Sequence, residues 1–165
     1  MPIVFRSNEI EFNELQSDMQ QYSWYSSPRL SEMGKSEDLF FNVRKLDTGK
    51  YSYPYHYHRN AEEVLLIISG SATLRTEDGL EIVNKGDILF FEKGKSSVHQ
   101  LYNHTSEPCV YFDIRTNNGF DVAEFPDTNK LIIDPEMDIF ERGDNVDYFK
   151  GEEQIDEIWK ELKNK

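Results

Sequence analysis

Eight short runs of strand-forming residues between Leu39 and Arg115 constrain the fold of this chain more than any other feature. The runs are LFFNVRKL, YPYHYH, EVLLIIS, ATLRT, LEIV, ILFF, VHQLY and CVYFDIR, and turn residues such as Gly, Asn and Asp separate them. Asp78-Gly79 is a strong hairpin signal, and no run has the helical periodicity of a βαβ unit. Closely spaced short strands without helices between them indicate an all-β barrel or two-sheet jelly roll.

Two polar segments flank this region, and the chain of 165 residues is about the size of one domain. Residues 1–38 are expected to form an N-terminal arm packed on the core, with weak helical spacing from Asn8 to Gln21. Residues 39–116 are the expected barrel core. Residues 117–165 are an expected C-terminal extension in which LII adds a strand and EEQIDEIWKELKNK forms an amphipathic helix. We expect this helix to dock on the barrel, with binding of a partner as the alternative.

The composition excludes several classes of partner. Lys and Arg number 18 against 31 Asp and Glu, which gives a net charge of −13, so the chain repels nucleic acid and anionic membrane surfaces. The longest apolar run, VLLII, falls far short of the roughly 20 residues of a membrane helix. A single cysteine, Cys109, and the lack of a signal-peptide pattern at the start predict a cytoplasmic protein in a reducing compartment.

Histidines are concentrated in the second run of this region. In a strand, residues two apart point to the same face, so His56 and His58 are expected side by side. The alternate tyrosines of this run and of the residues just before it then line the opposite face: Tyr51, Tyr53, Tyr55 and Tyr57. We interpret these tyrosines as packing residues rather than as a ligand cage.

Two further residues complete a predicted metal site. The turn at 59–61 resets the alternation, so Glu63 can return beside the two histidines on the next strand. His99 comes from a later strand, with apolar neighbours around it. Three imidazoles and a carboxylate suit one divalent transition metal per chain, and the set does not choose among Mn, Fe, Co, Ni, Cu and Zn. The predicted metal ligands are His56, His58, Glu63 and His99.

The segment from Gly49 to Gly70 resembles the first sequence motif of the cupin superfamily. In that motif a glycine precedes His-x-His, and a glutamate and a second glycine follow at set distances. Here four residues separate His58 from Glu63 and six separate Glu63 from Gly70, as in the motif. The gap of six residues from Gly49 to His56 is one residue longer than usual.

A second segment, GDILFFEKGKSSVHQLYN, resembles the second cupin motif. Its two glycines, His99 and Asn103 occur in the expected order, with the expected three residues between His99 and Asn103. Glu92 replaces the usual proline, and the gap before His99 is two residues longer. The resemblance implies a jelly-roll barrel that holds a divalent metal at the four predicted ligands, and it also implies a homodimer.

A closer resemblance extends from about residue 24 to the C-terminal region through PYHYH, HQLYNHTSEP, EFPDTNK and RGDNVDYFKGE. These segments are similar to a bacterial group of single-domain cupins labelled as candidate sugar-phosphate isomerases. That label is itself an inference, so it says more about the fold than about the reaction.

Several neighbouring residues have simpler interpretations. Glu62 competes with Glu63 as the carboxylate ligand, but the spacing to Gly70 favours Glu63. His104 is expected at the surface, with an inward acid or base as the alternative. Cys109 is expected to be a buried small residue rather than a nucleophile. Asn103 is expected to shape a turn and to support the site from outside the ligand set.

The run VLLII, residues 64–68, is apolar on both alternating faces. One face is expected to line the barrel interior. The other requires a second sheet or a partner subunit, which favours a homodimer.

Three functions fit these observations. The first is a metal-dependent enzyme on a small polar, sugar-like substrate, with isomerase-type chemistry. The second is an Fe(II)-dependent dioxygenase. The third is a module that binds or senses a small ligand without turnover. No proton carrier is identified for the isomerase, and Arg59, Lys93 and Lys95 are either a phosphate anchor or ordinary solvated cations.

Overall fold

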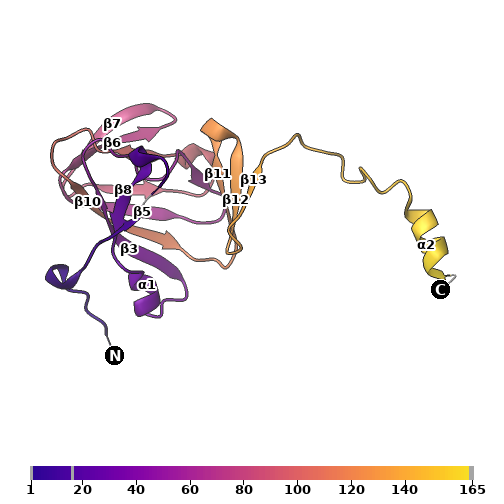
Figure 1. The fold of residues 1–165 in the computed structure, drawn as a ribbon, viewed down its shortest axis with the longest axis horizontal. Helices are drawn as coiled ribbons and strands as arrows, with labels where there is room; N and C mark the ends of the chain where they lie inside the picture. Colours follow the sequence, from indigo (N-terminus) through magenta and orange to yellow (C-terminus); the bar gives the residue numbers. More distant parts are fainter. Residues whose placement is uncertain (1, 16, 164–165) are drawn as a thin grey trace.

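A computed structural model of the protein describes residues 2–15 and 17–163. Met1 and Gln16 of the predicted N-terminal arm, and residues 164–165 of the predicted extension, lie outside the described residues. Figure 1 shows a body of stacked sheets and a long C-terminal segment that leaves this body and ends in a helix. No helix in the described ranges is long and apolar enough to cross a membrane.

The largest sheet is antiparallel and has the strand order β1-β2-β3-β10-β5-β8. Its strands are β1 (Asn13–Leu15), β2 (Trp24–Ser26), β3 (Leu39–Leu46), β10 (Cys109–Thr116), β5 (Glu63–Ser69) and β8 (Ile88–Phe91). In the β5–β10 register, Glu63 lies opposite Arg115 and Leu65 opposite Asp113. Alternate residues of a strand share a face, so these side chains enter the interior from neighbouring strands.

Two smaller antiparallel sheets, with the orders β13-β12-β11-β4 and β7-β6-β9, complete the body. Their strands are β4 (Tyr57–His58), β6 (Ser71–Thr76), β7 (Gly79–Asn84), β9 (Gln100–Tyr102), β11 (Asp121–Phe125), β12 (Lys130–Asp134) and β13 (Asp138–Glu141). The helices are α1 (Leu30–Met33) and α2 (Ile155–Lys163). Because β11 pairs with β4, the C-terminal extension lies directly beside the strand that carries His58.

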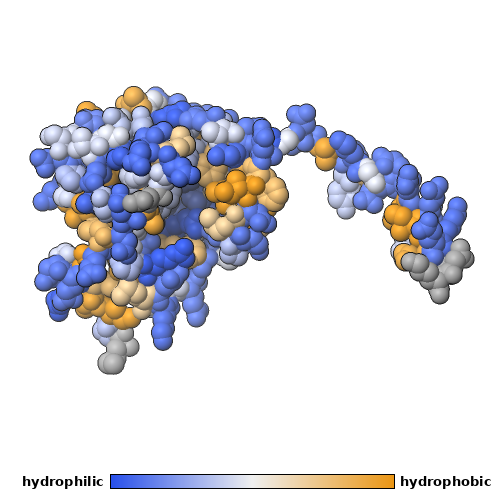
Figure 2. Space-filling view, in the orientation of Figure 1, coloured by the Kyte–Doolittle hydropathy of each residue, from blue (hydrophilic) through white to orange (hydrophobic). Residues whose placement is uncertain are grey.

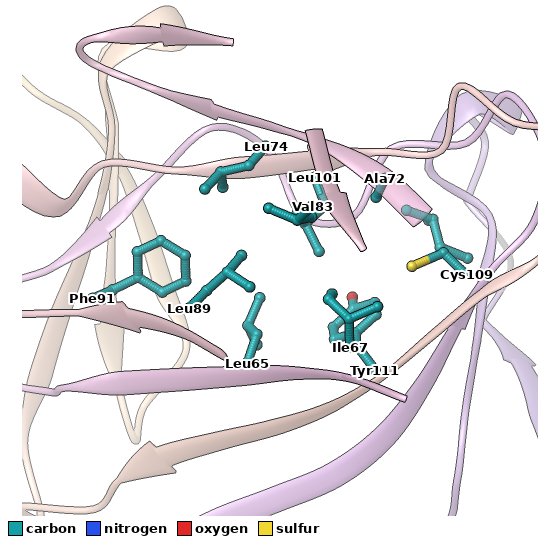
Figure 3. Packing of buried hydrophobic residues seen from close by; sticks show 11 residues of the cluster. Leu65, Ile67, Ala72, Leu74, Val83, Leu89, Phe91, Leu101, Cys109 and Tyr111 are labelled. Carbon is teal, nitrogen blue, oxygen red and sulfur yellow. The ribbon is translucent and has the colours of Figure 1, made fainter. Parts of the chain in front are cut away.

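The main apolar core fills the space between the large sheet and the β7-β6-β9 sheet. Figure 3 shows Leu65, Ile67 and Tyr111 pointing from the large sheet toward Val83 and Leu101 of the smaller one. The whole cluster consists of Leu46, Leu65, Ile67, Ala72, Leu74, Val83, Leu89, Phe91, Leu101, Cys109 and Tyr111. The all-β jelly-roll architecture is therefore confirmed, and its strands β3, β5 and β8 have the predicted limits.

One turn of this framework requires glycine. Gly70 joins β5 to β6 with φ +76°, a conformation that residues with a side chain rarely adopt. A Cβ at this position would collide with the carbonyl oxygen of Pro108. The first motif's final glycine therefore has a backbone role that sets the sharp return after β5.

The weak helical spacing from Asn8 to Gln21 does not correspond to an α-helix in the described residues of this segment. The described residues between Asn8 and Gln21 form strand β1 and the ends of short 3₁₀ turns at Ser7–Glu9 and Gln20–Tyr22. Pairing of β1 with β2 outweighs the weak local helical preference, since tertiary contacts commonly override propensity.

The C-terminal helix forms as predicted, but it does not dock on the barrel. The exposed fractions of Ile155, Ile158, Trp159 and Leu162 range from 44% to 56%, and no residue of α2 is buried. Figure 1 shows α2 at the far end of the segment that leaves the body at β13. The amphipathic pattern predicted the helix but not the surface that covers its apolar side.

The predicted tyrosine face is also not formed as a regular ladder. Only Tyr57–His58 of the YPYHYH run is a strand, because Pro54 has no N–H and interrupts the extended segment. The ring of Tyr53 lies 5.9 Å from that of His56, edge to face, so this tyrosine is near the histidines instead of opposite them. Tyr55 and Tyr57 pack with Val98 in a separate small cluster.

Candidate metal centre

Four predicted ligand residues reach one interior region from different backbone segments. His58 ends β4 and Glu63 begins β5, so the short turn between these strands carries them to neighbouring positions. His56 and His99 form an isolated antiparallel bridge, in which each backbone N–H donates to the other's carbonyl oxygen at 3.1 and 2.9 Å. This bridge fixes the second and third imidazoles side by side.

Possible ligand atoms of His56, His58 and Glu63 all lie within 4.8 Å of one another. These three residues could therefore hold a metal ion. His99 lies outside that tight group but close to its carboxylate, with Nε2 3.2 Å from Glu63 Oε2. His58 Nε2 lies 3.7 Å from the same oxygen, and the ring centres of His56 and His99 are 4.8 Å apart.

The outer nitrogen of each imidazole is held by an acceptor. Nδ1 of His56 lies 2.9 Å from the carbonyl oxygen of Pro54, and Nδ1 of His99 lies 2.9 Å from that of Ser97. Nδ1 of His58 lies 2.5 Å from Asp121 Oδ2. A carbonyl or carboxylate oxygen accepts only, so Nδ1 carries the proton and the neutral ring presents a free lone pair at Nε2. This tautomer is the one that ligates a metal through Nε2.

Glu63 supplies the anionic group at the centre of these nitrogens. Its side chain is buried, and among the described residues Oε2 is the one buried side-chain polar atom without a hydrogen-bond partner. A buried carboxylate is costly unless it is paired, and the atoms close to this oxygen are imidazole nitrogens at 3.2 and 3.7 Å, so it is suited to a cation that the three imidazoles share. Burial alone would raise the pKa of Glu63, but the surrounding imidazoles outweigh it and lower the pKa well below its ordinary value.

The imidazoles differ in their acid–base behaviour. Burial and the neighbouring His99 lower the pKa of His56 to about 3, so His56 stays neutral. Burial also acts to lower the pKa of His99, but the Glu63 carboxylate outweighs it and raises that pKa above 6.5. Without a metal, His99 therefore holds a proton more readily than His56.

Aromatic rings enclose the centre. The ring of Phe91 stacks on His99 with 3.6 Å between ring centres, and Phe125 stacks on His56 at 5.7 Å. Phe125 is the last residue of β11, so the C-terminal extension helps to cover the imidazoles. These rings exclude water from one side of the site and limit the movement of the ligands.

A second group of polar side chains lies in the interior beside Glu63. Asp113 Oδ2 accepts a hydrogen bond from Arg44 Nε at 3.1 Å, and Arg44 Nη1 donates to Ser26 Oγ at 2.7 Å. The guanidinium also lies over the rings of Trp24 and Tyr53, at 4.7 and 5.5 Å from their centres. These contacts hold the Arg44 head group rigidly, and with it the Asp113 carboxyl.

The Asp113 carboxyl is buried close to a second acidic group. Its burial and the nearby Glu63 carboxylate raise its pKa to about 6, although Arg44 acts in the opposite direction. A carboxyl with such a pKa exchanges its proton near neutral pH. This property is required of a general acid or base.

Asp121 supports the site from behind His58. Its Oδ2 binds Nδ1 of His58, and its Oδ1 accepts from the backbone N–H of Asn60 at 2.8 Å. Arg115 lies 3.8 Å from the same carboxylate and donates to Asp134 at 2.6 Å. Burial would raise the pKa of Asp121, but the His58 and Asn60 hydrogen bonds lower it below its ordinary value.

Glu62, His104 and Cys109 have the surroundings that their non-functional interpretations predicted. Glu62 is exposed, whereas Glu63 is buried. His104 is exposed and contacts Thr73 Oγ1 at 2.9 Å, away from the centre. Cys109 is fully buried, and this burial raises the pKa of its thiol to about 11.

Asn103 and the basic residues Arg59 and Lys93 were candidates for a supporting role and a phosphate anchor, and their contacts assign them neither role. Asn103 is fully buried and donates to the carbonyl oxygens of Leu46 and Glu107, so it shapes the turn but contacts no ligand. Arg59 pairs with Glu124, and Lys93 contacts Asn60 at 3.4 Å. These contacts do not gather the basic residues into a phosphate site.

The sequence reasoning missed Arg44, Asp113 and Asp121. Asp113 had a detectable signal, because it shares its strand face with Cys109 and Tyr111, where an isolated carboxylate is unusual. Asp121 had no local signal, since 63 positions separate it from His58. Its role follows from the pairing of β11 with β4, which the sequence pattern did not predict.

Comparison with known proteins agrees with this architecture. A family model described as "Cupin domain" matches residues 42–115. No curated protein is a significant match to the chain.

Solved structures share the fold at low identity. A candidate sugar phosphate isomerase from Acidithiobacillus ferrooxidans has a TM-score of 0.75 at 18% identity, over 87% of this chain and 97% of that one. A sugar phosphate isomerase from a cupin superfamily, from Silicibacter pomeroyi, has a TM-score of 0.74 at 20% identity, over 88% and 98%. A predicted oxalate decarboxylase from Thermotoga maritima has a TM-score of 0.58 at 20% identity, over 69% and 98%. Residues 42–115 thus match a cupin domain, and the solved structures share this fold over most of the chain.

Proposed function

We propose that the chain is a metal-dependent enzyme that acts on a small polar, sugar-like substrate by isomerase-type chemistry. The observation that carries this proposal is the unpartnered, buried Glu63 Oε2 beside imidazoles whose Nδ1 atoms are all held by acceptors. Two similar solved structures of nearly the same matched length bear the name sugar phosphate isomerase, which supports the substrate class.

The proposed ligands are Nε2 of His56, His58 and His99 together with Oε2 of Glu63. A divalent transition metal bound there, such as Mn, Fe, Zn, Ni or Co, would act as a Lewis acid on a carbonyl oxygen. The protein's part is to hold each ligand in the correct tautomer, through Pro54, Ser97 and Asp121, and to keep the region dry with Phe91 and Phe125.

Asp113 is the proposed proton carrier. An aldose–ketose isomerisation moves one proton between neighbouring carbons and one proton between their oxygens, with no net oxidation. A single carboxyl can remove and return the carbon proton if its pKa lies near the working pH, and the pKa of Asp113 is raised to about 6. Arg44 positions the carboxyl through Nε and is itself fixed against Trp24 and Tyr53.

The cytoplasmic location and the homodimer belong to the same proposal. The single buried Cys109 suits a reducing compartment, since no internal disulfide is possible. The outer side of β5 leaves Ile68 exposed, which suits contact with a second subunit.

The decisive experiment combines metal analysis with a substrate screen. Protein purified without chelators is expected to contain about one divalent metal per chain and to interconvert an aldose–ketose pair from a panel of free and phosphorylated sugars. Asp113→Asn is expected to keep its metal and lower kcat by roughly 10²–10⁴, whereas Asp127→Asn on the surface has no such effect. No metal uptake would disprove the site, and oxygen consumption by an iron-loaded sample without isomerisation would favour the dioxygenase.

A further inference from the structure

The C-terminal arm, residues 143–163, carries apolar side chains that its own body does not cover. Val146, Tyr148 and Phe149 are 63%, 89% and 69% exposed. In α2 the apolar residues recur at helical spacing on one side: Ile155, Ile158, Trp159 and Leu162. Figure 2 shows orange atoms at α2 on a segment that is otherwise mostly blue and stands away from the body.

The helix also needs a surface for physical reasons. It has nine residues, and isolated helices shorter than about 12–15 residues are marginal in water. Helices of this length in proteins owe most of their stability to packing of an apolar side. The arm is therefore a docking element.

The body has a complementary apolar surface on the outer side of the large sheet. In the β5–β8 register Val64 lies opposite Phe90 and Leu66 opposite Ile88, so these side chains share one face. Ile68, Ile88 and Phe90 are 41%, 71% and 61% exposed. We call this group the β5–β8 outer face: Val64, Leu66, Ile68, Ile88 and Phe90.

The neighbouring part of the same sheet surface has aromatic contacts within the chain. Phe112 of β10 lies opposite Leu66 and is therefore continuous with the β5–β8 outer face. Phe41 lies 6.0 Å from Phe112, and Phe5 of the N-terminal segment lies 6.2 Å from Phe41, both edge to face. The N-terminal segment thus contacts this surface at β3, whereas Ile68, Ile88 and Phe90 on the β5–β8 side are exposed.

We propose that two copies of the chain exchange C-terminal arms, and that each copy lays the apolar stripe of α2 across the β5–β8 outer face of the other. This inference rests on the proposed homodimer and is independent of the metal chemistry. Each copy provides both an arm and a receiving face, so a single two-fold association satisfies both copies, as in an isologous interface.

The area supports a stable dimer. One aromatic side chain buries about 150–250 Å² of accessible surface. Tyr148, Phe149 and the apolar stripe of α2 together therefore offer on the order of 700 Å² of surface per arm for burial. Two arms and two receiving faces then exceed the ~1,600 Å² of a standard interface. The net charge of −13 on each copy opposes association, so apolar contact must drive it and added salt is expected to strengthen it.

The test uses full-length variants and measures mass by light scattering and sedimentation over a range of concentrations. Trp159→Glu on the stripe and Phe90→Glu on the receiving face are each expected to weaken the dimer at least about tenfold. Lys160→Gln, which changes the charge of α2 by the same amount, and Leu80→Glu, on the exposed outer side of β7, are the matched controls and should have no effect. Ile88→Glu replaces Phe90→Glu if that variant does not fold.

Mixing the two disrupted variants tests exchange directly. Phe90→Glu retains an intact arm and Trp159→Glu retains an intact face, so the mixture is expected to form heterodimers that neither variant forms alone. A dimer unaffected by both substitutions, or a mixture without heterodimers, would overturn the exchange. A monomeric wild-type chain would overturn both the dimer and the exchange, and unchanged metal content in these samples would leave the proposed metal site standing.

Discussion

The two ends of the barrel interior are built by the same strands from opposite kinds of side chain. At one end, β3, β5 and β10 supply Leu46, Ile67 and Cys109, each no more than 1% exposed. At the other end, β5 and β10 supply Glu63 and Asp113, which are almost as deeply buried at 6% and 8%. Ile67 and Glu63 are four positions apart on β5, and Cys109 and Asp113 are four positions apart on β10, so each strand changes from apolar to ionic side chains within this distance.

This difference separates the source of stability from the source of chemistry. Buried apolar surface stabilises the fold by about 25 cal/mol per Å², whereas buried charges destabilise it unless they are paired. Asp113 has Arg44 as its partner. Glu63 Oε2 has no hydrogen-bond partner among the described residues, so the polar end is complete only with the proposed cation.

The largest effect is expected from removing an imidazole at the polar end. His56→Ala or His99→Ala should remove most bound metal and lower the thermal stability of the metal-loaded protein, because ligand binding to the folded state stabilises it. Elemental analysis and thermal melts measure both effects. His104→Ala, which removes the exposed histidine, should leave both unchanged. Normal metal content in both ligand variants would refute the assignment.

A substitution at the apolar end of the interior should lower the stability of the fold without changing the metal content. Ile67→Ala removes a side chain that is 1% exposed and should lower the free energy of unfolding by about 2–5 kcal/mol, with metal stoichiometry unchanged. Ile82→Ala, at a position of β7 that is 59% exposed, should change it by less than about 1 kcal/mol. Urea denaturation of the metal-free protein compares the two. Equal losses would show that buried and exposed isoleucines contribute alike to the stability of the fold.

The all-β architecture could be predicted because the strand pattern is local. Runs such as EVLLIIS and ILFF carry their own β preference and turn signals, and β5 and β8 have the predicted limits. The location of α2 could not be predicted in this way, since a helical pattern specifies an apolar side but not the surface that receives it. The weak helical spacing of the N-terminal segment did not indicate its structure, because pairing with β2 decided it.

The candidate centre was predictable to the extent that its residues lie close together in sequence. His56, His58 and Glu63 come together as expected, since one strand and one turn connect them. Asp113 and Asp121 reach the site only through the β5–β10 and β4–β11 pairings. Such long-range pairing is a property of the fold, and the local pattern of a single sequence does not reveal it.

A smaller effect is expected at the residue that supports His58. Asp121→Asn keeps the shape of the side chain but removes the charge that holds Nδ1 of His58. Loss of such a supporting partner typically lowers metal affinity by about 10–100-fold. Competition with a chelator measures this change. Asp127→Asn, at an exposed carboxylate paired with Arg75, is the control and should leave the affinity unchanged.

The smallest effect is a proton released when the metal binds. The Glu63 carboxylate raises the pKa of His99, and a metal requires the neutral imidazole, so uptake at pH 6.5 should displace up to about one proton per chain. Metal affinity should therefore rise as pH rises through that pKa. Calorimetry in two buffers of different ionisation enthalpy measures the release, which should fall toward zero in alkali. No release near pH 6.5 would mean that His99 is already neutral.

The same imidazoles give the metal-free protein a defined response to pH. Because the pKa of His99 is raised in the folded state, its contribution to stability is present below pH 6.5 and is lost as pH rises through the raised value. His56 acts in the opposite direction: its pKa is lowered to about 3, so stability falls as pH decreases from about 6.5 to about 3. The lowered pKa of Glu63 adds to this loss in acid. His99 and Asp113, whose pKa values are raised, act against this loss between pH 7 and pH 4, so the His56 contribution is isolated by comparison with a variant. Chelated wild-type protein is expected to lose more stability than chelated His56→Ala when the pH falls from 7 to 4, as measured by urea denaturation, and equal changes in the two proteins would contradict a buried, neutral His56.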